Sequence, residues 1–185
     1  KQGSPWRSPL LLVVQRAPDG TVKLRLCADY RALNAKTRTN SYRMPRIRDI
    51  LEMCALATWI STMDQPSAFL WLMIAWASRF KTAIEWRNKV YVFTRAMFGL
   101  EGSPFVQQKM IDQVLASVPN TAGFLDDLCC TSEGLWSNHL DALARTFAAL
   151  AKSRLSLKLS KCFFARRRVD LLGFEITVGP DGGRW

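Results

Sequence analysis

The sequence predicts an α+β fold with helices on one face of an antiparallel sheet. An apolar, strand-like run over residues 58–64 ends in an acid, and a second run over residues 124–131 has two acids at a hairpin turn. Residues 138–152 carry apolar side chains at the spacing of an amphipathic helix. Strand, helix and strand followed by hairpin, helix and strand is typical of helices segregated to one side of a sheet. The opposite face is then expected to carry a ligand.

The other elements follow from periodicity, turn residues and helix caps. Pro18-Asp19-Gly20 predicts a tight turn, and Pro45 and Ser103 each suit the start of a helix. Residues 31–42 are polar and predict a loop. In chain order, the remaining predicted strands are 10–14, 22–30, 59–64, 83–93 (as a hairpin), 154–159 and 169–178, and the remaining predicted helices are 47–55, 67–77 and 103–118.

Composition indicates a basic globular protein. The chain has 185 residues, 49% of them hydrophobic, which is enough for one compact domain or for two subdomains that share a core. A net charge of +11 and a pI of about 9.9 favour a polyanionic partner, nucleic acid before an anionic membrane. A basic protein of ribosomal type would carry the same charge, so charge by itself names no activity.

Several classes of protein are excluded. The single histidine, His139, excludes a histidine-pair metal site and argues against a Ser-His-Asp triad, and it is expected to cap or pack. No run of roughly 18 uncharged apolar residues occurs, so no transmembrane helix and no membrane partner are expected. The five cysteines include no C-x-x-C pair, which excludes a zinc ribbon and predicts reduced thiols in an intracellular protein. Lys1 stands in place of an initiator Met, so the chain is expected to be a piece of a longer protein.

Three acids stand in apolar surroundings. Asp126 and Asp127 lie inside the run 123–130, and Asp64 ends the run 58–64. A carboxylate charge in an apolar hairpin carries a desolvation penalty unless a positive charge offsets it. A divalent metal is the usual partner, and phosphoryl-transfer enzymes hold Mg²⁺ in this way. Asp64, Asp126 and Asp127 are therefore candidate metal ligands and catalytic residues, and an ordinary acidic turn is the alternative.

Eight segments resemble, in order, the motifs of reverse transcriptases, in particular those of gypsy-type long-terminal-repeat retrotransposons and of retroviruses. A lone pair of acids is common by chance, whereas eight motifs near the family's spacing are a specific signal that runs almost end to end. The segments are Ser4-Pro5-Trp6-Arg7-Ser8-Pro9, Arg25-Leu26-Cys27-Ala28-Asp29-Tyr30-Arg31-Ala32-Leu33-Asn34, Met63-Asp64 with Ser67-Ala68-Phe69, Phe80-Lys81-Thr82-Ala83, Phe98-Gly99-Leu100 with Ser103-Pro104, Phe124-Leu125-Asp126-Asp127, Leu157-Lys158-Leu159-Ser160-Lys161-Cys162, and Leu171-Leu172-Gly173-Phe174.

The resemblance implies the fingers and palm of a right-hand polymerase, with helices on one face of an antiparallel palm sheet. Residues 1–42 and 72–102 would form the fingers, and residues 43–71 and 103–185 the palm. The thumb is expected to be absent, as are the connection and RNase H segments, because the sequence stops at Trp185. A weak grip on the primer–template duplex is therefore expected.

The resemblance also implies template-directed DNA synthesis by two-metal nucleotidyl transfer. Two Mg²⁺ ions, for which Mn²⁺ can substitute, would lie roughly 3.5–4 Å apart and stabilise the attacking and leaving oxygens. Asp64 and Asp126 would bridge both ions, and Asp127 would complete the ligand shell. The implied partners are an RNA template, a DNA primer and a deoxynucleoside triphosphate (dNTP), with other protein subunits or a ribonucleoprotein assembly as further candidates.

The same resemblance assigns further site residues. Arg25 would grip the triphosphate, because a guanidinium fork matches phosphate oxygens, although a solvated arginine of a strand has the same pattern. Phe69 would lie against the sugar and exclude a 2′-hydroxyl, or would fill the core. Lys161, or Lys158, would protonate the pyrophosphate or bind a backbone phosphate. The remaining candidates are Phe98, Gly99 and Gln108 at the nucleotide and template pocket, and Phe124, Leu172 and Gly173 at the primer; Arg16 and Lys23 are expected to be solvated.

Departures from the family pattern keep a second function open. Phe124 replaces the usual tyrosine, Pro66 follows the metal-ligand region, Met97 stands where proline is usual, and residues 70–76 are unusually apolar. The alternative is a catalytically inert, domesticated relic that binds RNA or forms a structural component of a ribonucleoprotein assembly, which a charge of +11 fits equally well. A different RNA-binding sheet domain ranks last, because the aromatic pair that such domains carry on adjacent strands is missing.

Overall fold

The protein is represented by a computed structural model, which describes residues 4–16, 20–38 and 42–179. Contacts along the chain divide it into two compact units. The first unit comprises Lys1–Ser41 and Phe69–Pro104, and the second comprises Tyr42–Ala68 and Phe105–Trp185. Within the described residues, no helix combines the length and the apolar character that crossing a membrane requires.

The first unit contains an antiparallel two-stranded ribbon. β1 (Leu10–Arg16) pairs along its whole length with β2 (Val22–Ala28), as predicted. Two residues of the predicted turn Pro18-Asp19-Gly20, 18 and 19, lie outside the described residues. The register places Val13 opposite Arg25 on one face of the ribbon. The other face carries apolar side chains that remain exposed, among them Leu12, Val14, Val22, Leu24 and Leu26.

The first unit also contains a short helix and a second hairpin. α1 (Arg31–Asn34) is one helical turn in a segment predicted to be a loop, and it forms because Leu33 is buried with Ile84 in one apolar cluster. β4 (Ile84–Trp86) and β5 (Lys89–Tyr91) form the second predicted hairpin. Its turn residues Arg87 and Asn88 have φ of 48° and 58°, the left-handed conformation that suits a two-residue hairpin turn.

Residues 67–77 do not form the predicted helix. The chain instead makes two 3₁₀ segments, Ala68–Trp71 and Trp76–Thr82. Ser67 has φ of 53°, which lies outside the α-helical region, and Met73 forms an isolated β-bridge with Arg95. The helical spacing of apolar residues therefore predicts this segment wrongly, because the backbone of Met73 pairs with that of the distant Arg95.

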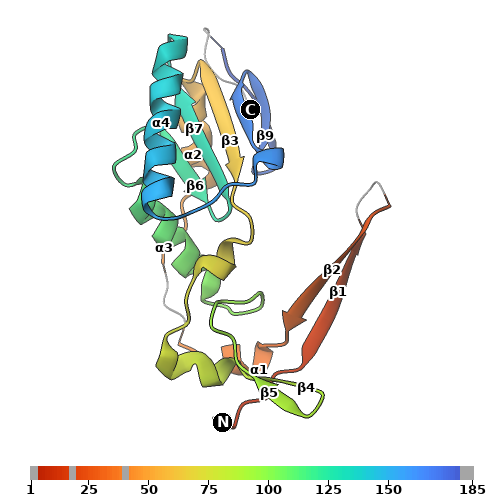
Figure 1. Ribbon diagram of the computed structural model, residues 1–185. Coiled ribbons are helices and arrows are strands. Elements are labelled where there is room, and N and C mark those ends of the chain that lie inside the picture. The colour runs from red at the N-terminus through yellow and green to blue at the C-terminus, as the bar shows by residue number, and fades with distance from the viewer. Residues whose placement is uncertain (1–3, 17–19, 39–41, 180–185) are drawn as a thin grey trace. The chain divides into compact units, whose positions relative to one another are not determined.

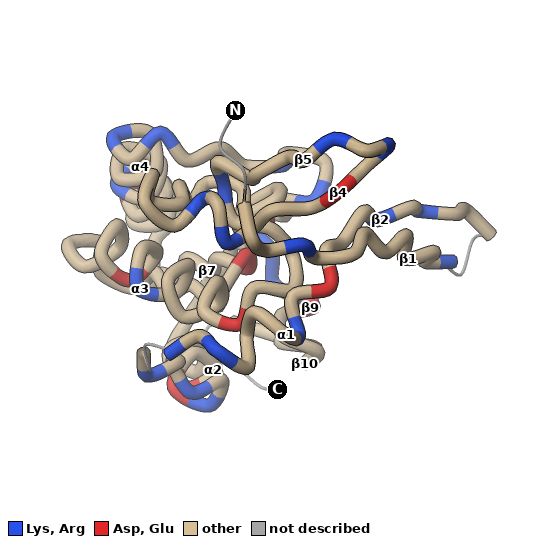
Figure 2. Tube along the Cα trace, turned by 90° about the horizontal axis from the view of Figure 1, so that it is seen from below, with Lys and Arg blue, Asp and Glu red and all other residues tan. Residues whose placement is uncertain are grey.

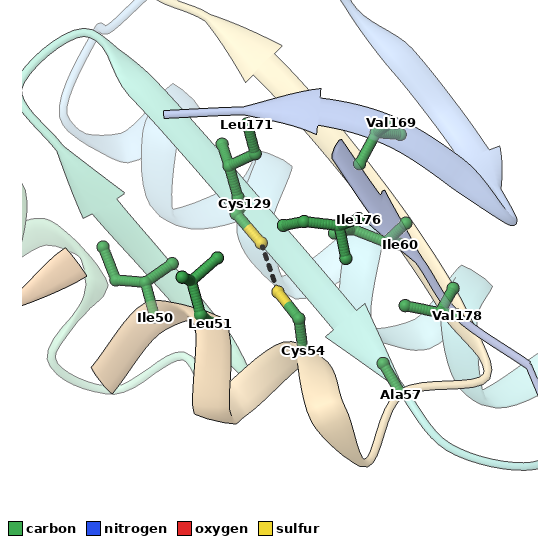
Figure 3. Close-up of a cluster of buried hydrophobic side chains, with 10 residues drawn as sticks. All are labelled: Ile50, Leu51, Cys54, Ala57, Ile60, Cys129, Val169, Leu171, Ile176 and Val178. Atoms are coloured by element: carbon green, nitrogen blue, oxygen red, sulfur yellow. Dashed lines mark hydrogen bonds between the residues drawn. The ribbon is translucent and has the colours of Figure 1, made fainter. Parts of the chain in front are cut away.

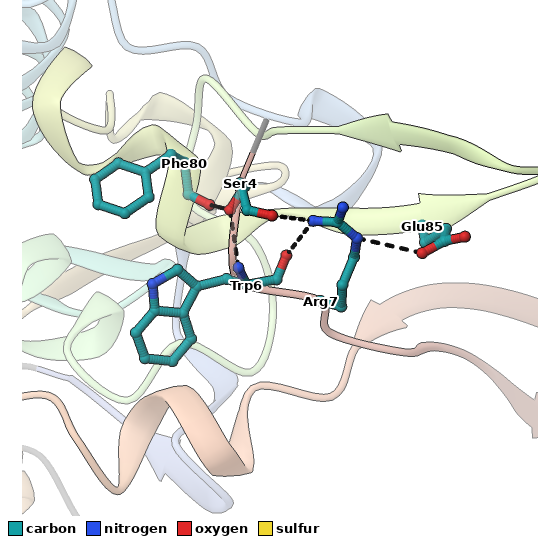
Figure 4. Close-up of polar contacts among 5 residues, drawn as sticks. All are labelled: Ser4, Trp6, Arg7, Phe80 and Glu85. Atoms are coloured by element: carbon teal, nitrogen blue, oxygen red, sulfur yellow. Dashed lines mark hydrogen bonds and ion pairs between the residues drawn. The ribbon is translucent and has the colours of Figure 1, made fainter. Parts of the chain in front are cut away.

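The segment before β1 is tied to the first unit by hydrogen bonds (Figure 4). Ser4 Oγ donates to the carbonyl of Phe80 over 2.6 Å and accepts the N–H of Trp6 over 3.1 Å. The Arg7 guanidinium pairs with Glu85 over 3.2 Å and donates to the carbonyls of Trp6 and Ser4. The first segment of the family resemblance thus anchors this part of the chain to β4.

The second unit is an antiparallel sheet with strand order β6-β7-β3-β8 (Figure 1). Each neighbouring pair of strands is antiparallel, so the predicted α+β class with an antiparallel sheet is confirmed. The strands are β3 (Trp59–Asp64), β6 (Thr121–Phe124), β7 (Asp127–Ser132) and β8 (Phe163–Arg166), and the helices packed on them are α2 (Ile47–Ala55), α3 (Ser103–Leu115) and α4 (Trp136–Lys152).

Helices pack on both faces of this sheet, not on one face as the sequence predicted, because β3 carries buried apolar side chains on both of its faces. Met63 of β3 shares a buried cluster with Ile111 of α3 and Leu143 of α4. Ile60, which points to the opposite face because its position differs from that of Met63 by an odd number, shares a cluster with Leu51 of α2. Figure 1 shows α4 in front of the sheet and α2 behind it.

The cluster against α2 also contains two thiols (Figure 3). Cys54 of α2 and Cys129 of β7 place their sulfur atoms 3.9 Å apart in a thiol hydrogen bond. The hairpin of β9 (Arg168–Leu171) and β10 (Phe174–Thr177) adds Val169 and Ile176 to the same cluster. The five cysteines are free thiols, as predicted.

The C-terminal strands differ from the prediction in two places. Residues 154–159 form no strand, since Arg154 turns the chain with φ of 56°, and the strand that joins the sheet is β8. Residues 169–178 form the β9–β10 hairpin rather than one strand, and this hairpin turns at Leu172 and Gly173 with φ of 54° and 83°. Pairing with β3 decides where β8 begins, and local sequence carries no sign of that pairing.

Candidate active site

The three candidate acids meet at one end of the sheet. Asp64, the last residue of β3, lies opposite Asp127, the first residue of β7. The N–H of Gln65 donates to the carbonyl of Asp126 over 2.9 Å, which continues the pairing one residue further. Because opposite residues of paired strands point to the same face, the Asp64 and Asp127 side chains are neighbours, with Asp126 in the turn beside them.

A two-residue turn, Leu125-Asp126, joins β6 to β7 and presents the acids. Leu125 has φ of 57°, an unfavourable conformation for a residue with a bulky side chain. Its N–H donates to Oε1 of Gln108 over 2.9 Å, and Nε2 of Gln108 donates to the carbonyl of Gly123 over 2.8 Å. α3 can approach this closely because Gly123 lacks a side chain, whose Cβ would collide with Ile111. The helix therefore holds the turn in its strained shape.

Lys161 lies among the acids. Its Nζ is 2.8 Å from Oδ1 of Asp64, and the side chains of Lys161 and Asp64 are 54% and 17% exposed. Burial, followed by the charges of Asp126 and Asp64, raises the pKa of Asp127, while Lys161 opposes the rise. The hydrogen bond to Asp64 raises the pKa of Lys161. The site is thus a group of repelling carboxylates that one ammonium partly neutralises.

A short 3₁₀ turn, Leu159–Lys161, brings this ammonium to the site. The N–H of Lys158 donates to the carbonyl of Asp64 over 2.9 Å, and the N–H of Lys161 donates to the carbonyl of Lys158 over 2.8 Å. Of the two lysines that the sequence offered, the one whose side chain pairs with an acid is Lys161.

The acids have the right chemistry for a hard divalent cation. Mg²⁺ prefers carboxylate oxygens and keeps several water ligands, so one or two protein carboxylates suffice. Asp64 and Asp127 supply these from adjacent strands, and Asp126 adds a third acid. Among residues 4–16, 20–38 and 42–179, no group of three or more His, Cys, Asp or Glu side chains is placed so that it could hold a metal ion as it stands. The repulsion that contributes to the raised pKa of Asp127 is the kind that a bound cation relieves.

The first unit gathers several of the predicted nucleotide-binding residues. Cζ of Arg25 lies 5.8 Å from the centroid of the Phe98 ring, and the Phe69 and Phe98 rings meet edge to face with centroids 5.5 Å apart. Gly99 has φ of 98°, and a Cβ there would lie 2.9 Å from the carbonyl oxygen of Ala28, so a larger residue would be strained and crowded. A guanidinium beside two aromatic rings suits a ligand that carries phosphate and a flat or apolar group.

Asn34 fixes the loop that carries Phe98 and Gly99. Its Nδ2 donates to the carbonyl of Gly99 over 2.8 Å, and its Oδ1 accepts the N–H of Glu101 over 3.2 Å. Nearby in the chain, the buried Tyr30 hydroxyl donates to the carbonyl of Thr82 over 3.1 Å. Asn34 and Tyr30 thus hold the backbone at Gly99, Glu101 and Thr82 in place.

The other predicted site residues lie in the second unit. Gln108 is fully buried behind the acidic turn, bonded to that turn's backbone, and does not face the surface. Phe124 and Leu172 both pack against the cluster beside α2, and Gly173 completes the β9–β10 turn. Direct contacts of these residues with nucleotide or primer stay predictions.

Two polar residues behind the acids escaped the sequence analysis. Gln65 and Gln107 are buried, and Nε2 of Gln107 donates to Oε1 of Gln65 over 3.0 Å. A signal for Gln107 was present, because it lies one helical turn before the buried Ile111 and so falls on the apolar stripe of α3. Gln65 gave a weaker signal, as a single polar residue after a strand.

Comparison with known proteins settles the family. The family model described as reverse transcriptase (RNA-dependent DNA polymerase) matches residues 16–176, a range that includes the acids, Lys161 and the Arg25 cluster. The chain belongs to the reverse transcriptase family. The resemblance drawn from its motifs is therefore confirmed.

Retrotransposons are one source of sequence relatives of this family member. It is 32% identical over 186 residues to the retrovirus-related Pol polyprotein from transposon 297 of Drosophila melanogaster, and 30% identical over 183 residues to that from transposon gypsy of the same species. The alignments cover 98% and 97% of the chain but 17% of each polyprotein. The chain thus spans about a sixth of the length of these relatives.

Solved structures of a foamy viral protease-reverse transcriptase share the fold. The TM-score is 0.84 at 29% identity for its complex with an RNA/DNA hybrid, and 0.85 at 30% identity for a complex with double-stranded DNA. Each match covers 96% of this chain, and 23% and 30% of the foamy viral chains. The predicted fold class, fingers and palm of a right-hand polymerase, is confirmed.

Proposed function

We propose that this chain is the fingers-and-palm part of a larger Pol polyprotein that copies a template into DNA. The observation that carries the proposal is the meeting of Asp64, Asp126 and Asp127 at the paired ends of β3 and β7, with Lys161 on Asp64. We assign the first unit to the fingers and the second unit to the palm.

The carboxylates of Asp64, Asp126 and Asp127 would hold two divalent cations, Mg²⁺ or Mn²⁺. When bound, such cations favour ionisation of the primer 3′-hydroxyl and offset charge on the phosphate oxygens. Before binding, the carboxylates repel one another, as the raised pKa of Asp127 reflects together with its burial. The protein's own contribution is to hold these charges close together on two paired strands.

The proposed reaction is an in-line displacement at the α-phosphorus of a dNTP. The primer 3′-hydroxyl gives up its proton to solvent water, a bond forms from O3′ to this phosphorus, and the bond from phosphorus to the bridging oxygen breaks, so that pyrophosphate leaves with the electron pair. Lys161 is placed to give the leaving pyrophosphate a proton. The hydrogen bond to Asp64 raises the pKa of Lys161, so the ammonium holds its proton at neutral pH before the reaction.

The cluster of Arg25, Phe69 and Phe98 would bind the dNTP. Arg25 suits the triphosphate, and the flat Phe69 ring would lie against the sugar and exclude a 2′-hydroxyl. An RNA template and a DNA primer are the proposed nucleic-acid partners. They are supported by the net charge of +11 and by the foamy viral relatives, whose structures contain an RNA/DNA hybrid or double-stranded DNA.

Primer extension on poly(rA)/oligo(dT) with Mg²⁺ tests the proposal. The Asp126→Asn/Asp127→Asn variant is expected to lose at least about 10³-fold in rate, the scale on which kcat falls when stabilisation of developing charge is removed. Protein in excess over primer–template, in a single-turnover assay, keeps weak binding from hiding the chemistry. Asp141→Asn, on the exposed surface of α4, is the matched control and should extend primers normally.

Extension that survives in the Asp126→Asn/Asp127→Asn variant would contradict the proposal. A folded chain that binds RNA but extends no primer, even in excess, would favour the inert RNA-binding relic instead.

A further inference from the structure

Two consecutive buried glutamines on α3 reach the two segments that carry the acids. Gln107 and Gln108 are both fully buried. Neighbouring residues of a helix point in directions about 100° apart, so the two amides leave α3 toward different parts of the sheet. Both side chains therefore lie inside the protein.

Gln107 reaches the end of β3. Its Nε2 donates to Oε1 of Gln65 over 3.0 Å, inside the protein. Gln65 directly follows Asp64, and its N–H donates to the carbonyl of Asp126 over 2.9 Å. The Gln65 side chain and backbone therefore connect α3, Asp64 and Asp126 through two hydrogen bonds.

Gln108 reaches the acidic turn itself. It accepts the N–H of Leu125 and donates to the carbonyl of Gly123, on either side of Phe124. The same amide donates to Oδ1 of Asp112 over 2.8 Å. One turn of α3 thus holds the acidic turn by its backbone and the end of β3 through the Gln65 side chain.

The Gln65–Gln107 pair is less favourable for folding than two apolar side chains in the same space would be. Nε2 of Gln65 and Oε1 of Gln107 are buried and have no hydrogen-bond partner among the described residues. A buried donor and a buried acceptor without partners cost folding free energy, whereas two apolar side chains of the same shape would cost none. The amide pair is therefore present although it lowers the stability of the protein, which suggests a role other than packing.

We propose that the Gln65–Gln107 pair is a positioning device that sets the distance between Asp64 and the Asp126-Asp127 turn before metal binds. The inference rests on the proposed function, since it concerns the same metal-binding acids. Carboxylates that repel one another would drift apart on a loose strand end, and the amide link to α3 prevents this. Groups that orient metal ligands typically change metal affinity by roughly 10–100-fold when removed.

The test replaces both glutamines by methionine, which keeps length and volume but removes the polar link. In the Gln65→Met/Gln107→Met variant of the 185-residue chain, Mn²⁺ affinity measured by electron paramagnetic resonance without substrate should fall about tenfold. The thermal midpoint should stay the same or rise. In single-turnover extension, the maximal rate constant should fall, with little change in the dNTP concentration that gives half of the maximal rate. Gln113→Met, an exposed glutamine of the same helix, is the matched control and should change none of these.

Hydrogen exchange gives a readout that needs no metal. In the double variant, the N–H of Gln65 should exchange about tenfold faster, while amides in the middle of β3 keep their protection. Unchanged exchange at Gln65 together with Mn²⁺ affinity within twofold of the parent chain would overturn the proposal. Loss of folding in the double variant would also overturn it, because the pair would then serve the fold rather than the geometry of the acids.

The proposed function and this inference fail in different ways. If the parent chain and its Asp126→Asn/Asp127→Asn variant bind Mn²⁺ equally, the metal site is refuted. Hydrogen exchange at Gln65 then decides the positioning role by itself, with faster exchange supporting it and unchanged exchange overturning it.

Discussion

Several residues at the site have a conformation or surroundings that lower the stability of the folded protein. Leu125 has φ of 57°, Asp127 carries its charge beside Asp64 and Asp126, and the Gln65–Gln107 pair leaves two polar atoms unpartnered among the described residues. Each feature costs folding free energy, and such costs concentrate at functional sites. Replacing one of these residues is therefore expected to stabilise the protein while it impairs the site.

Asp127→Asn should be more stable than the parent chain at pH 7 without metal. The pKa of Asp127 is raised above its ordinary value of 3.8, so the folded state loses stability as pH rises from 3.8 through the raised pKa. Removing the charge should restore up to about 1 kcal/mol, discounted for the exposure of this side chain, or up to about 4 °C in Tm. Thermal unfolding in a chelator checks this.

The stability that Asp127→Asn gains should disappear near pH 3, where the Asp127 carboxyl is mostly neutral in both the folded and the unfolded state. A variant less stable than the parent chain at pH 7 would contradict the prediction.

At the scale of elements, one histidine joins α4 to the sheet. His139 is fully buried, with Nε2 2.7 Å from Oγ of Ser61 on β3 and Nδ1 2.8 Å from Oγ of Ser132 on β7. A neutral imidazole has one donor and one acceptor, and serine hydroxyls can complement both. These contacts pack His139 between α4 and the sheet, as expected. Burial lowers the pKa of His139.

This lowered pKa predicts a loss of stability in mild acid. Below pH 6.5, the ordinary value, the unfolded state takes up a proton at His139 while the folded state does not. The free energy of unfolding should therefore fall as pH drops from 6.5 toward the lowered pKa, by at most about 1.4 kcal/mol per pH unit. Urea unfolding at pH 7.5, 6.5 and 5.5 measures the slope.

His139→Gln should flatten this slope while lowering stability at pH 7.5 by about 1–3 kcal/mol through lost hydrogen bonds. Ser137→Ala, at an exposed position of α4, should keep the slope of the parent chain. An unchanged slope in His139→Gln would assign the acid sensitivity to other groups.

At the scale of the whole molecule, positive charge recurs along the chain. Lys and Arg number 26 against 15 Asp and Glu. Figure 2 shows their positions on the β1–β2 ribbon, on the β4–β5 hairpin and on the helices of the second unit. The first unit has 13 Lys and Arg against 4 Asp and Glu, and the second unit has 13 against 11, so the first unit carries most of the excess. Many separate cations suit contacts with phosphates along a nucleic acid rather than one anion.

Binding to an RNA/DNA hybrid should therefore depend steeply on salt. With roughly six phosphate contacts, the affinity is expected to fall about 10³-fold between 50 and 200 mM KCl, because binding releases condensed counterions. Fluorescence anisotropy of a labelled hybrid over this range gives the slope of log Kd against log salt. A flat slope would show that the excess charge does not contact phosphate.

Elements with a strong local pattern were predicted well. Ile47–Ala55 and Trp59–Asp64 have the predicted bounds, since helical spacing and strand-forming residues are properties of each segment by itself. The predictions for residues 67–77 and 154–159 were wrong, because the conformation of these segments is not a property of their local pattern. Their backbone conformation depends on Ser67 and Arg154 adopting positive φ, which local apolar spacing does not reveal.

The sequence by itself determined the three acids, the order of the motifs and hence the family, because residue type and spacing along the chain carry that information. Only the tertiary structure decided that Lys161 rather than Lys158 pairs with Asp64, that Gln108 is buried behind the acidic turn, and that Gln107 reaches Gln65. Those contacts join residues 15 to 97 positions apart, and no local pattern encodes a pairing over such distances.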